Sequence, residues 1–167
     1  AEEMVYRAVL IEVGVGIDGG DVFYGNIGSN ERMTNTVIGD NVNSSSRLEG
    51  LTRIYKVPVI CSEYVRNEAM KNSADYYFQE LDIVKVKGKK EGKRIYWPVS
   101  LDVLDKDLES RLELFDVALK AYYRGEWKDA EKYFTKAAIP AAEVFTGRIS
   151  GKKPPEDWNG IWTMKEK

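Results

Sequence analysis

Thr36-Val-Ile-Gly-Asp-Asn-Val-Asn-Ser-Ser-Ser-Arg47 is the stretch that decides the fold of this 167-residue chain. A β-prone run meets a glycine and an acidic residue, and a helical pattern follows. We expect Asp40 to cap that helix, because its carboxylate can accept hydrogen bonds from the free N–H groups of the first turn. Asn43 and Arg47 are four residues apart and share one helix face. Such a face suits an oxygen-rich anion, although a solvated helix with one Asn and one Arg is the simpler alternative.

Two β-prone segments precede this stretch. Residues 5–17 and 21–27 are joined by the turn-forming sequence Asp18-Gly-Gly-Asp21, which predicts a β-hairpin. The glycines also match the G-x-G-x-x-G pattern of dinucleotide-binding folds, but that pattern needs a helix directly after it. A strand follows instead, so we interpret the glycines as places where the backbone turns or approaches another surface. Residues 28–33 are expected to form a polar loop.

The remainder of the first 100 residues alternates between helix and strand. The helix of residues 40–54 carries a buried stripe of Leu48, Leu51 and Tyr55. A strand is expected at 57–61, a helix capped by Ser62 at 62–70, and a hairpin of residues 76–86 with 94–99. This pattern predicts an α+β layer with an antiparallel-rich sheet.

A basic window lies at the turn of that last hairpin. Residues 85–94 hold six basic side chains and one acid. A solvated hairpin tip is the simplest interpretation. Nucleic-acid binding is disfavoured, because the loop has no aromatic residue on which bases could stack. A third interpretation is that Lys87, at the strand end, reaches an anionic ligand.

The character of the sequence changes after residue 100. Residues 105–123 and 126–138 have helical periodicity, separated by Gly125 and ended by Pro140. Small and aromatic residues at Ala118, Ala130, Phe134 and Ala137 resemble the spacing of a tetratricopeptide helix pair. We therefore divide the chain into residues 1–100 and a helical segment with a tail at 101–167. A single pair must pack on the preceding domain, on a second copy or on a partner. The tail is expected to lie along the surface.

Composition excludes several function classes. The chain has no histidine, so Ser-His and Cys-His catalysis are absent, and its single cysteine, Cys61, reads as a small core residue. A net charge of −2 argues against general nucleic-acid coating. No apolar run approaches the ~18 residues of a spanning helix, and no signal peptide begins the sequence. Membrane contact within this chain is therefore not expected.

Three linked motifs resemble the class III nucleotide cyclase catalytic domain, in its C-terminal half. They are the glycine-rich segment of residues 14–28, the Thr36-Val-Ile-Gly-Asp-x-Val-Asn segment that continues to Arg47-Leu-Glu, and Val86-Lys-Gly-Lys89. The resemblance covers residues 8–99 and implies part of a ferredoxin-like cyclase domain. The tail resembles the C-terminal region of bacterial multidomain cyclases.

The resemblance implies an adenylate cyclase, a phosphorus–oxygen lyase of signal transduction that converts ATP to cyclic AMP and pyrophosphate. By position, Asn43 matches the asparagine that orients the ribose, and Arg47 the arginine that stabilises charge on the reacting phosphates. Lys87 matches the lysine that holds the terminal phosphates. Thr36 falls where a residue reads the purine edge, as in adenylate rather than guanylate cyclases. Phosphoryl transfer depends mostly on positioning and charge neutralisation, which suits these side chains.

The resemblance also has consequences for what surrounds this chain. The family uses Mg²⁺ or Mn²⁺ held by two aspartates upstream of the glycine-rich segment, so the ligands are expected outside this chain and no metal-binding residue is assigned here. We expect the chain alone to make no cyclic nucleotide and to form a homodimer. We expect it to act in the cytoplasm, as the catalytic part of a longer protein that is either membrane-anchored or not. The alternative is a non-catalytic pseudo-cyclase or regulatory interaction module.

Overall fold

The computed structural model describes residues 12–29, 32–72, 75–86 and 91–164. In chain order, its elements are β1 (Val15–Ile17), β2 (Phe23–Ser29), β3 (Arg32–Ile38), α1 (Asp40–Tyr55), β4 (Val59–Ser62), α2 (Glu63–Lys71), β5 (Tyr76–Val86), β6 (Lys93–Ser100), α3 (Lys106–Tyr123), α4 (Trp127–Ala137), α5 (Ala142–Ile149) and β7 (Trp162–Met164). The elements combine helices with a mixed β-sheet, which confirms the predicted α+β class.

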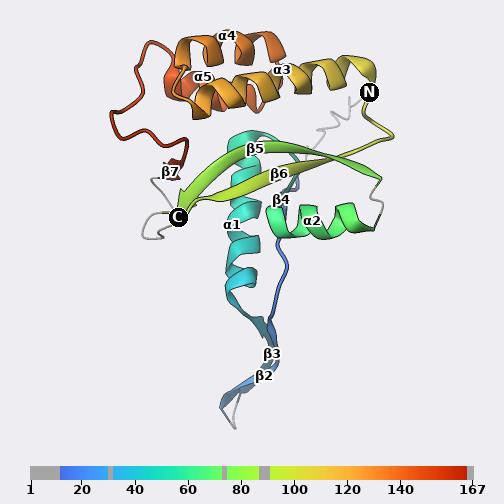
Figure 1. Ribbon diagram of the computed structural model, residues 1–167. Coiled ribbons are helices and arrows are strands. Elements are labelled where there is room, and N and C mark those ends of the chain that lie inside the picture. The colour runs from blue at the N-terminus through green and yellow to red at the C-terminus, as the bar shows by residue number, and fades with distance from the viewer. Residues whose placement is uncertain (1–11, 30–31, 73–74, 87–90, 165–167) are drawn as a thin grey trace, which may run out of the picture.

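One sheet organises the fold. Its strand order is β1-β4-β6-β5-β7, in which β1 is parallel to β4, β7 is parallel to β5, and the two central pairings are antiparallel. Figure 1 shows α3, α4 and α5 together on one side of β5 and β6, with α2 on the other side. Helix α1 leads from the sheet toward the β2–β3 ribbon, which projects away from the rest of the molecule.

The predicted hairpin between residues 5–17 and 21–27 is wrong. Strand β2 pairs with β3, in continuous antiparallel register from Phe23 opposite Ile38 to Ser29 opposite Arg32. Residues 28–29 and 32–33, predicted to be loop, therefore extend the two strands of this ribbon. Strand β1 pairs with β4 instead, and its glycines let it lie against α1. The start of the predicted first strand falls in residues 1–11, which lie outside the described ranges.

Helix α1 begins as predicted, but its cap differs. Asp40 is the first helical residue, and Gly39 is the N-cap, with no side-chain capping bond. The Gly39 carbonyl accepts hydrogen bonds from the N–H groups of Val42 and Asn43. Asp40 instead places its carboxylate in the first turn, where the helix dipole favours negative charge. The predicted cap is wrong by one position.

The backbone of β1 lies directly against α1. A Cβ atom on Gly16 would lie 2.2 Å from the Ser45 carbonyl oxygen and 2.3 Å from the Glu49 nitrogen. This confirms the expectation that the glycines allow a close approach to another surface. On the same helix, Leu48 and Tyr55 are buried and Leu51 is partly buried, as the stripe predicted.

Two smaller predictions in the sheet region are also confirmed. Ser62 accepts a hydrogen bond from the Val65 N–H and caps α2. Cys61 is fully buried in β4, and burial raises the pKa of its thiol to about 12, so it behaves as a small core residue.

The helical segment has three helices where two were predicted. The four residues whose spacing resembles a tetratricopeptide pair are all buried, and they are Ala118, Ala130, Phe134 and Ala137. Helix α4 ends at Ala137, ahead of Pro140 as predicted, but a third helix, α5, begins at Ala142. The tetratricopeptide comparison itself remains a prediction.

The C-terminal tail packs against α3 and β5 as well as lying along the surface. The Trp158 Nε1 donates to the Tyr122 carbonyl over 3.0 Å, and β7 pairs with β5. Apolar side chains at Ile161 and Trp162 favour this packing over exposure. One cluster of buried side chains includes residues on both sides of residue 100; the division at that residue remains a prediction. Within the described ranges, no helix has the length and apolarity needed to cross a membrane.

Candidate active site

A cavity of about 290 Å³ lies between α1 and the β5–β6 hairpin. Its floor is apolar, formed by Leu48, Leu51, Val84 and Ile95. Polar side chains from the first two turns of α1 form one wall, and they are Asp40, Asn43, Ser44 and Arg47. Glu91 and Lys93, where β6 begins, form the opposite wall. The cavity therefore places an amide, two cations and two carboxylates around an apolar base.

Helical periodicity brings the two predicted catalytic residues to this cavity. Asn43 and Arg47 lie one turn apart on α1, and both side chains are exposed. Arg53, further along the helix, forms an ion pair with Glu49 at 3.0 Å. No comparable ion pair to Arg47 occurs within the described part of the chain, so its guanidinium is available to an anion.

Of the other two predicted site residues, one lies away from this cavity and one is outside the described ranges. Thr36 lies in β3, paired with Gly25 in the ribbon, and does not line the cavity. Lys87 lies outside the described residues. Lys93, which does line the cavity, was missed, although it belongs to the same basic window. Its signal was its position as the first residue of β6, on the strand that returns from the hairpin turn.

Hydrogen bonds fix the start of α1 against the end of β1. The Asp18 N–H donates to the Ser45 hydroxyl over 3.1 Å, and that hydroxyl donates to the Asn41 carbonyl over 2.9 Å. Partial burial would by itself raise the pKa of Asp18. The hydrogen bond from the Gly19 N–H, the nearby hydroxyl groups of Ser44 and Ser62, and the charge of Lys93 together outweigh burial and lower this pKa. The carboxylate thus stays ionised beside the cavity wall.

The described side chains do not assemble a metal site. No group of three or more His, Cys, Asp or Glu side chains that could hold a metal ion occurs among them. Asp40 and Glu91 line the cavity, but they come from different walls. The hydrogen-bond donors of the cavity, which are amide, guanidinium and ammonium groups, can bind an anionic, oxygen-rich ligand.

The family match and two curated relatives point to the same family. Residues 2–99 match the family described as "Adenylate and Guanylate cyclase catalytic domain". An adenylate cyclase of Anabaena cylindrica is 44% identical over 87 residues, which are 52% of this chain and 17% of that protein. The terminal-differentiation specific adenylate cyclase of Dictyostelium discoideum is 32% identical over 137 residues, or 77% of this chain and 6% of that protein.

Solved structures of adenylyl cyclases also resemble part of the chain. A bacterial light-regulated adenylyl cyclase aligns with a TM-score of 0.43 and 30% identity, over 51% of this chain and 23% of its own. The adenylyl cyclase CyaB from P. aeruginosa aligns with a TM-score of 0.42 and 28% identity, over 51% of this chain and 41% of its own. Because the family match spans more than half of its residues, the chain belongs to the adenylate and guanylate cyclase catalytic domain family.

Proposed function

We propose that this chain is part of an adenylate cyclase that converts ATP to cyclic AMP and pyrophosphate. The observation that carries the proposal is the α1 face, where Asn43 and Arg47 line one cavity, with Lys93 on the opposite wall. Family membership and two relatives named as adenylate cyclases support it. In the reaction, the ribose 3′-oxygen loses its proton and bonds to the α-phosphorus, and the bond from that phosphorus to the pyrophosphate oxygen breaks.

Each residue has a role in this proposal. Asn43 orients the ribose through its side-chain amide. Arg47 stabilises the charge that develops on the reacting phosphates, because its planar fork can donate two parallel hydrogen bonds. Lys93, and Lys87 by its position in the motif, hold the terminal phosphates of ATP. These groups act by positioning and charge neutralisation, which supply most of the catalysis of phosphoryl transfer.

Adenine is the base that we propose, with Thr36 as the residue that reads the purine edge. Threonine at this position of the motif is the support for adenylate rather than guanylate cyclase activity. Mg²⁺ or Mn²⁺ is proposed as the cofactor, with ligands outside this chain. A site that uses ATP is proposed to face the cytoplasm.

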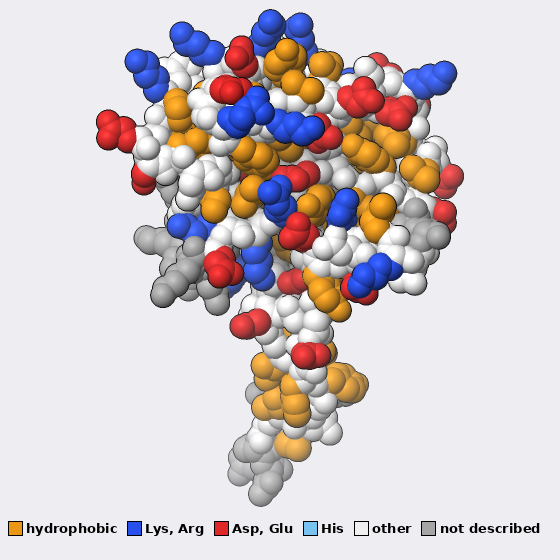
Figure 2. All heavy atoms as spheres, in the orientation of Figure 1, with side chains coloured by type: hydrophobic (Ala, Val, Ile, Leu, Met, Phe, Trp, Pro, Cys, Tyr) orange, Lys and Arg blue, Asp and Glu red, His pale blue; other side chains and the backbone are white. Residues whose placement is uncertain are grey.

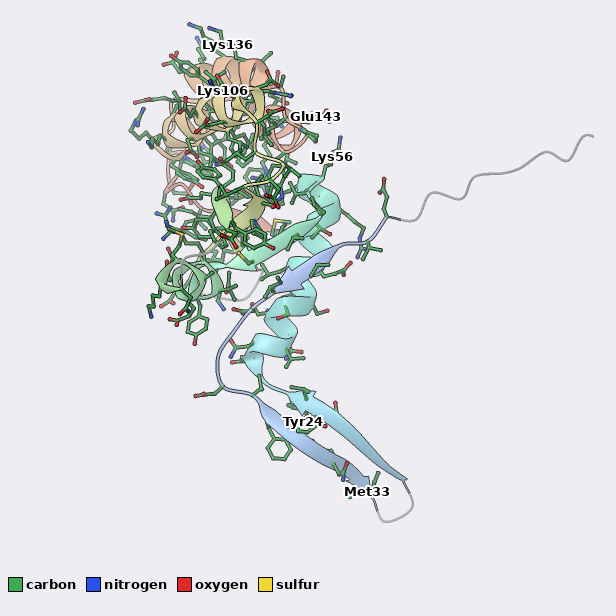
Figure 3. The ribbon with its side chains drawn as sticks, turned by 90° about the vertical axis from the view of Figure 1, so that its right-hand side faces the viewer. Tyr24, Met33, Lys56, Lys106, Lys136 and Glu143 are labelled. Atoms are coloured by element: carbon green, nitrogen blue, oxygen red, sulfur yellow. The ribbon has the colours of Figure 1, made fainter. Side chains whose placement is uncertain are left out.

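We further propose that the chain pairs with a second copy through the β2–β3 ribbon. Figure 2 shows apolar side chains gathered along this projecting ribbon, and Phe23 and Met33 are 59% and 60% exposed. Figure 3 shows Tyr24 and Met33 on the ribbon, beyond the first turn of α1. Apolar surface exposed on a narrow projection is typical of an interaction site.

Cyclic AMP formation tests the proposal. The purified 167-residue chain, given ATP and Mn²⁺, should form no cyclic AMP, and the same chain joined to an aspartate-bearing N-terminal half of a cyclase domain should form it. Measurable Mn²⁺-dependent product from the chain alone would show that the metal ligands lie within it. An inactive joined domain that still binds ATP would favour the non-catalytic, regulatory module.

A further inference from the structure

The C-terminal tail contacts the wall of the cavity that carries Lys93. Strand β7 is parallel to β5, with Trp162 opposite Val84 and Met164 opposite Val86. Val84 is part of the cavity floor, and Val86 directly precedes Lys87. The last strand of the chain therefore forms the edge of the sheet beside the cavity.

A side-chain contact joins the tail to the other strand of the hairpin. Gly92 lies between Glu91 and Lys93, the two residues that form the outer wall. A Cβ atom at Gly92 would lie 2.8 Å from Ile161 Cγ2 and 3.0 Å from Ile83 Cγ2. Ile161 thus occupies the space that a side chain at position 92 would need. It packs against the hairpin between the two wall residues, Glu91 and Lys93.

The tail also covers a buried polar network that connects α5, β5 and the end of α1. The Arg148 guanidinium donates to the Asp82 carboxylate of β5 over 2.6 Å and to the Tyr55 hydroxyl of α1 over 2.9 Å. The Trp162 ring lies over this guanidinium, with 4.4 Å between the ring centroid and Cζ. Tyr55 is one turn beyond Leu51 on α1, and Asp82 is two residues before Val84 on β5. The network therefore lies close to the part of the cavity that Leu51 and Val84 line.

The other end of the tail is anchored in the helical segment. Trp158 packs edge-on against Tyr122 and Trp127, with ring centroids 5.0 and 5.3 Å away. The six residues from Trp158 to Thr163 therefore run from the helices to the hairpin. This short connection therefore links the helical segment to the hairpin.

We propose that the tail, residues 158–164, is a positioning element of the nucleotide site, and that Ile161 and Trp162 hold the β5–β6 wall so that Lys93 faces Asn43 and Arg47. The ligand is the triphosphate of ATP, so this inference rests on the proposed function. Because neither Ile161 nor Trp162 lines the cavity, they act through the hairpin. They are positioning residues, not catalytic ones.

The test compares Ile161→Ala and Trp162→Ala with Thr163→Ala, whose exposed side chain lies on the same strand. ATP affinity of the full chain, measured by calorimetry, should fall about tenfold for Ile161→Ala, or ~1.4 kcal/mol, and remain within about twofold for Thr163→Ala. Hydrogen exchange of peptides covering residues 83–86 and 93–96 should accelerate in the first two variants only. Ile161→Ala removes less volume than Trp162→Ala, so it keeps the test available if Trp162→Ala does not fold.

A double-mutant cycle separates positioning from simple stabilisation. If Ile161 acts by placing Lys93, then Ile161→Ala should cost no further ATP affinity in a Lys93→Ala background. Additive losses would overturn the inference, as would faster exchange with unchanged affinity. If the unsubstituted chain binds no ATP, the proposed function fails; the exchange rates still report separately on whether the tail holds the hairpin.

Discussion

Arg148 and Asp82, 66 residues apart in the sequence, form a buried ion pair with 2.6 Å between Nη1 and Oδ2. The pair joins α5 to β5, and Tyr55 adds α1 by donating to the same carboxylate oxygen over 2.6 Å. Lys56 and Glu143 form a second, exposed ion pair between α1 and α5, and Figure 3 shows them adjacent at the end of α1. The helical segment is thus joined through specific polar contacts to the helix that carries Asn43 and Arg47.

Removing the Arg148 charge should be strongly destabilising. Arg148→Met leaves Asp82 buried without its cation, and such a loss costs about 3–5 kcal/mol. Urea unfolding followed by circular dichroism measures it. Arg124→Met removes an exposed ion pair with Glu126 and should leave the unfolding midpoint unchanged. Adding Asp82→Asn to Arg148→Met should recover part of the loss; no recovery would mean that the Asp82 charge is not the cause.

The approach of β1 to α1 predicts opposite effects for two glycines. Gly16→Ala places a Cβ against backbone atoms of α1 and should destabilise the chain by about 1–3 kcal/mol. Gly50→Ala, in the interior of α1, meets nothing within 4 Å and should stabilise it by about 0.5–1 kcal/mol. Thermal unfolding of both variants checks this. Equal effects would contradict the close packing of β1 on α1.

The proposed role of Arg47 predicts a change in turnover more than in binding. In a complete catalytic domain that contains this chain, Arg47→Ala should lower kcat about 100-fold or more, with little change in ATP affinity, because the interaction strengthens in the transition state. Arg53→Ala, on the same helix but outside the cavity, should leave kcat unchanged. Unchanged turnover in Arg47→Ala would remove Arg47 from the mechanism.

The apolar ribbon predicts a concentration-dependent dimer. Phe23→Ser combined with Met33→Ser should weaken self-association at least tenfold, since each side chain loses about 1.5 kcal/mol or more of burial. Val103→Ser, which changes an exposed apolar residue away from the ribbon, should not. Sedimentation velocity over a range of concentrations measures this. A monomer at all concentrations in the unsubstituted chain would exclude the ribbon as a dimer interface.

Local patterns predicted most of the elements and the pairing of β5 with β6, but not the partner of β2. The helix at residues 40–55, the cap at Ser62 and the hairpin of β5 with β6 follow from periodicity and turn chemistry. Strand pairing is a tertiary property, so β2 could be recognised as a strand while its partner was misidentified. Helix α5 was missed because Pro140 was interpreted as the end of the helical region, whereas α5 begins two residues after it.

Of the candidate site, only the part on helix α1 was predictable from the sequence. Spacing alone places Asn43 and Arg47 on a common face, and the structure brings both to one cavity. Lys93 comes from a strand 46 positions beyond Arg47, and only the folded hairpin reveals its place opposite them. The tail contact through Ile161 was invisible for the same reason: it depends on a glycine far away in the sequence.

The most direct test of the central claim is a titration of the ¹⁵N-labelled 167-residue chain with ATP, followed by NMR. The account predicts shifts of the amide signals of Asn43, Arg47 and Lys93 around the α1 cavity. Thr52 and Lys56, which line a second cavity at the other end of α1, should not shift. Shifts confined to Thr52 and Lys56, or none at millimolar ATP, would contradict the assignment of the α1 cavity as the nucleotide site.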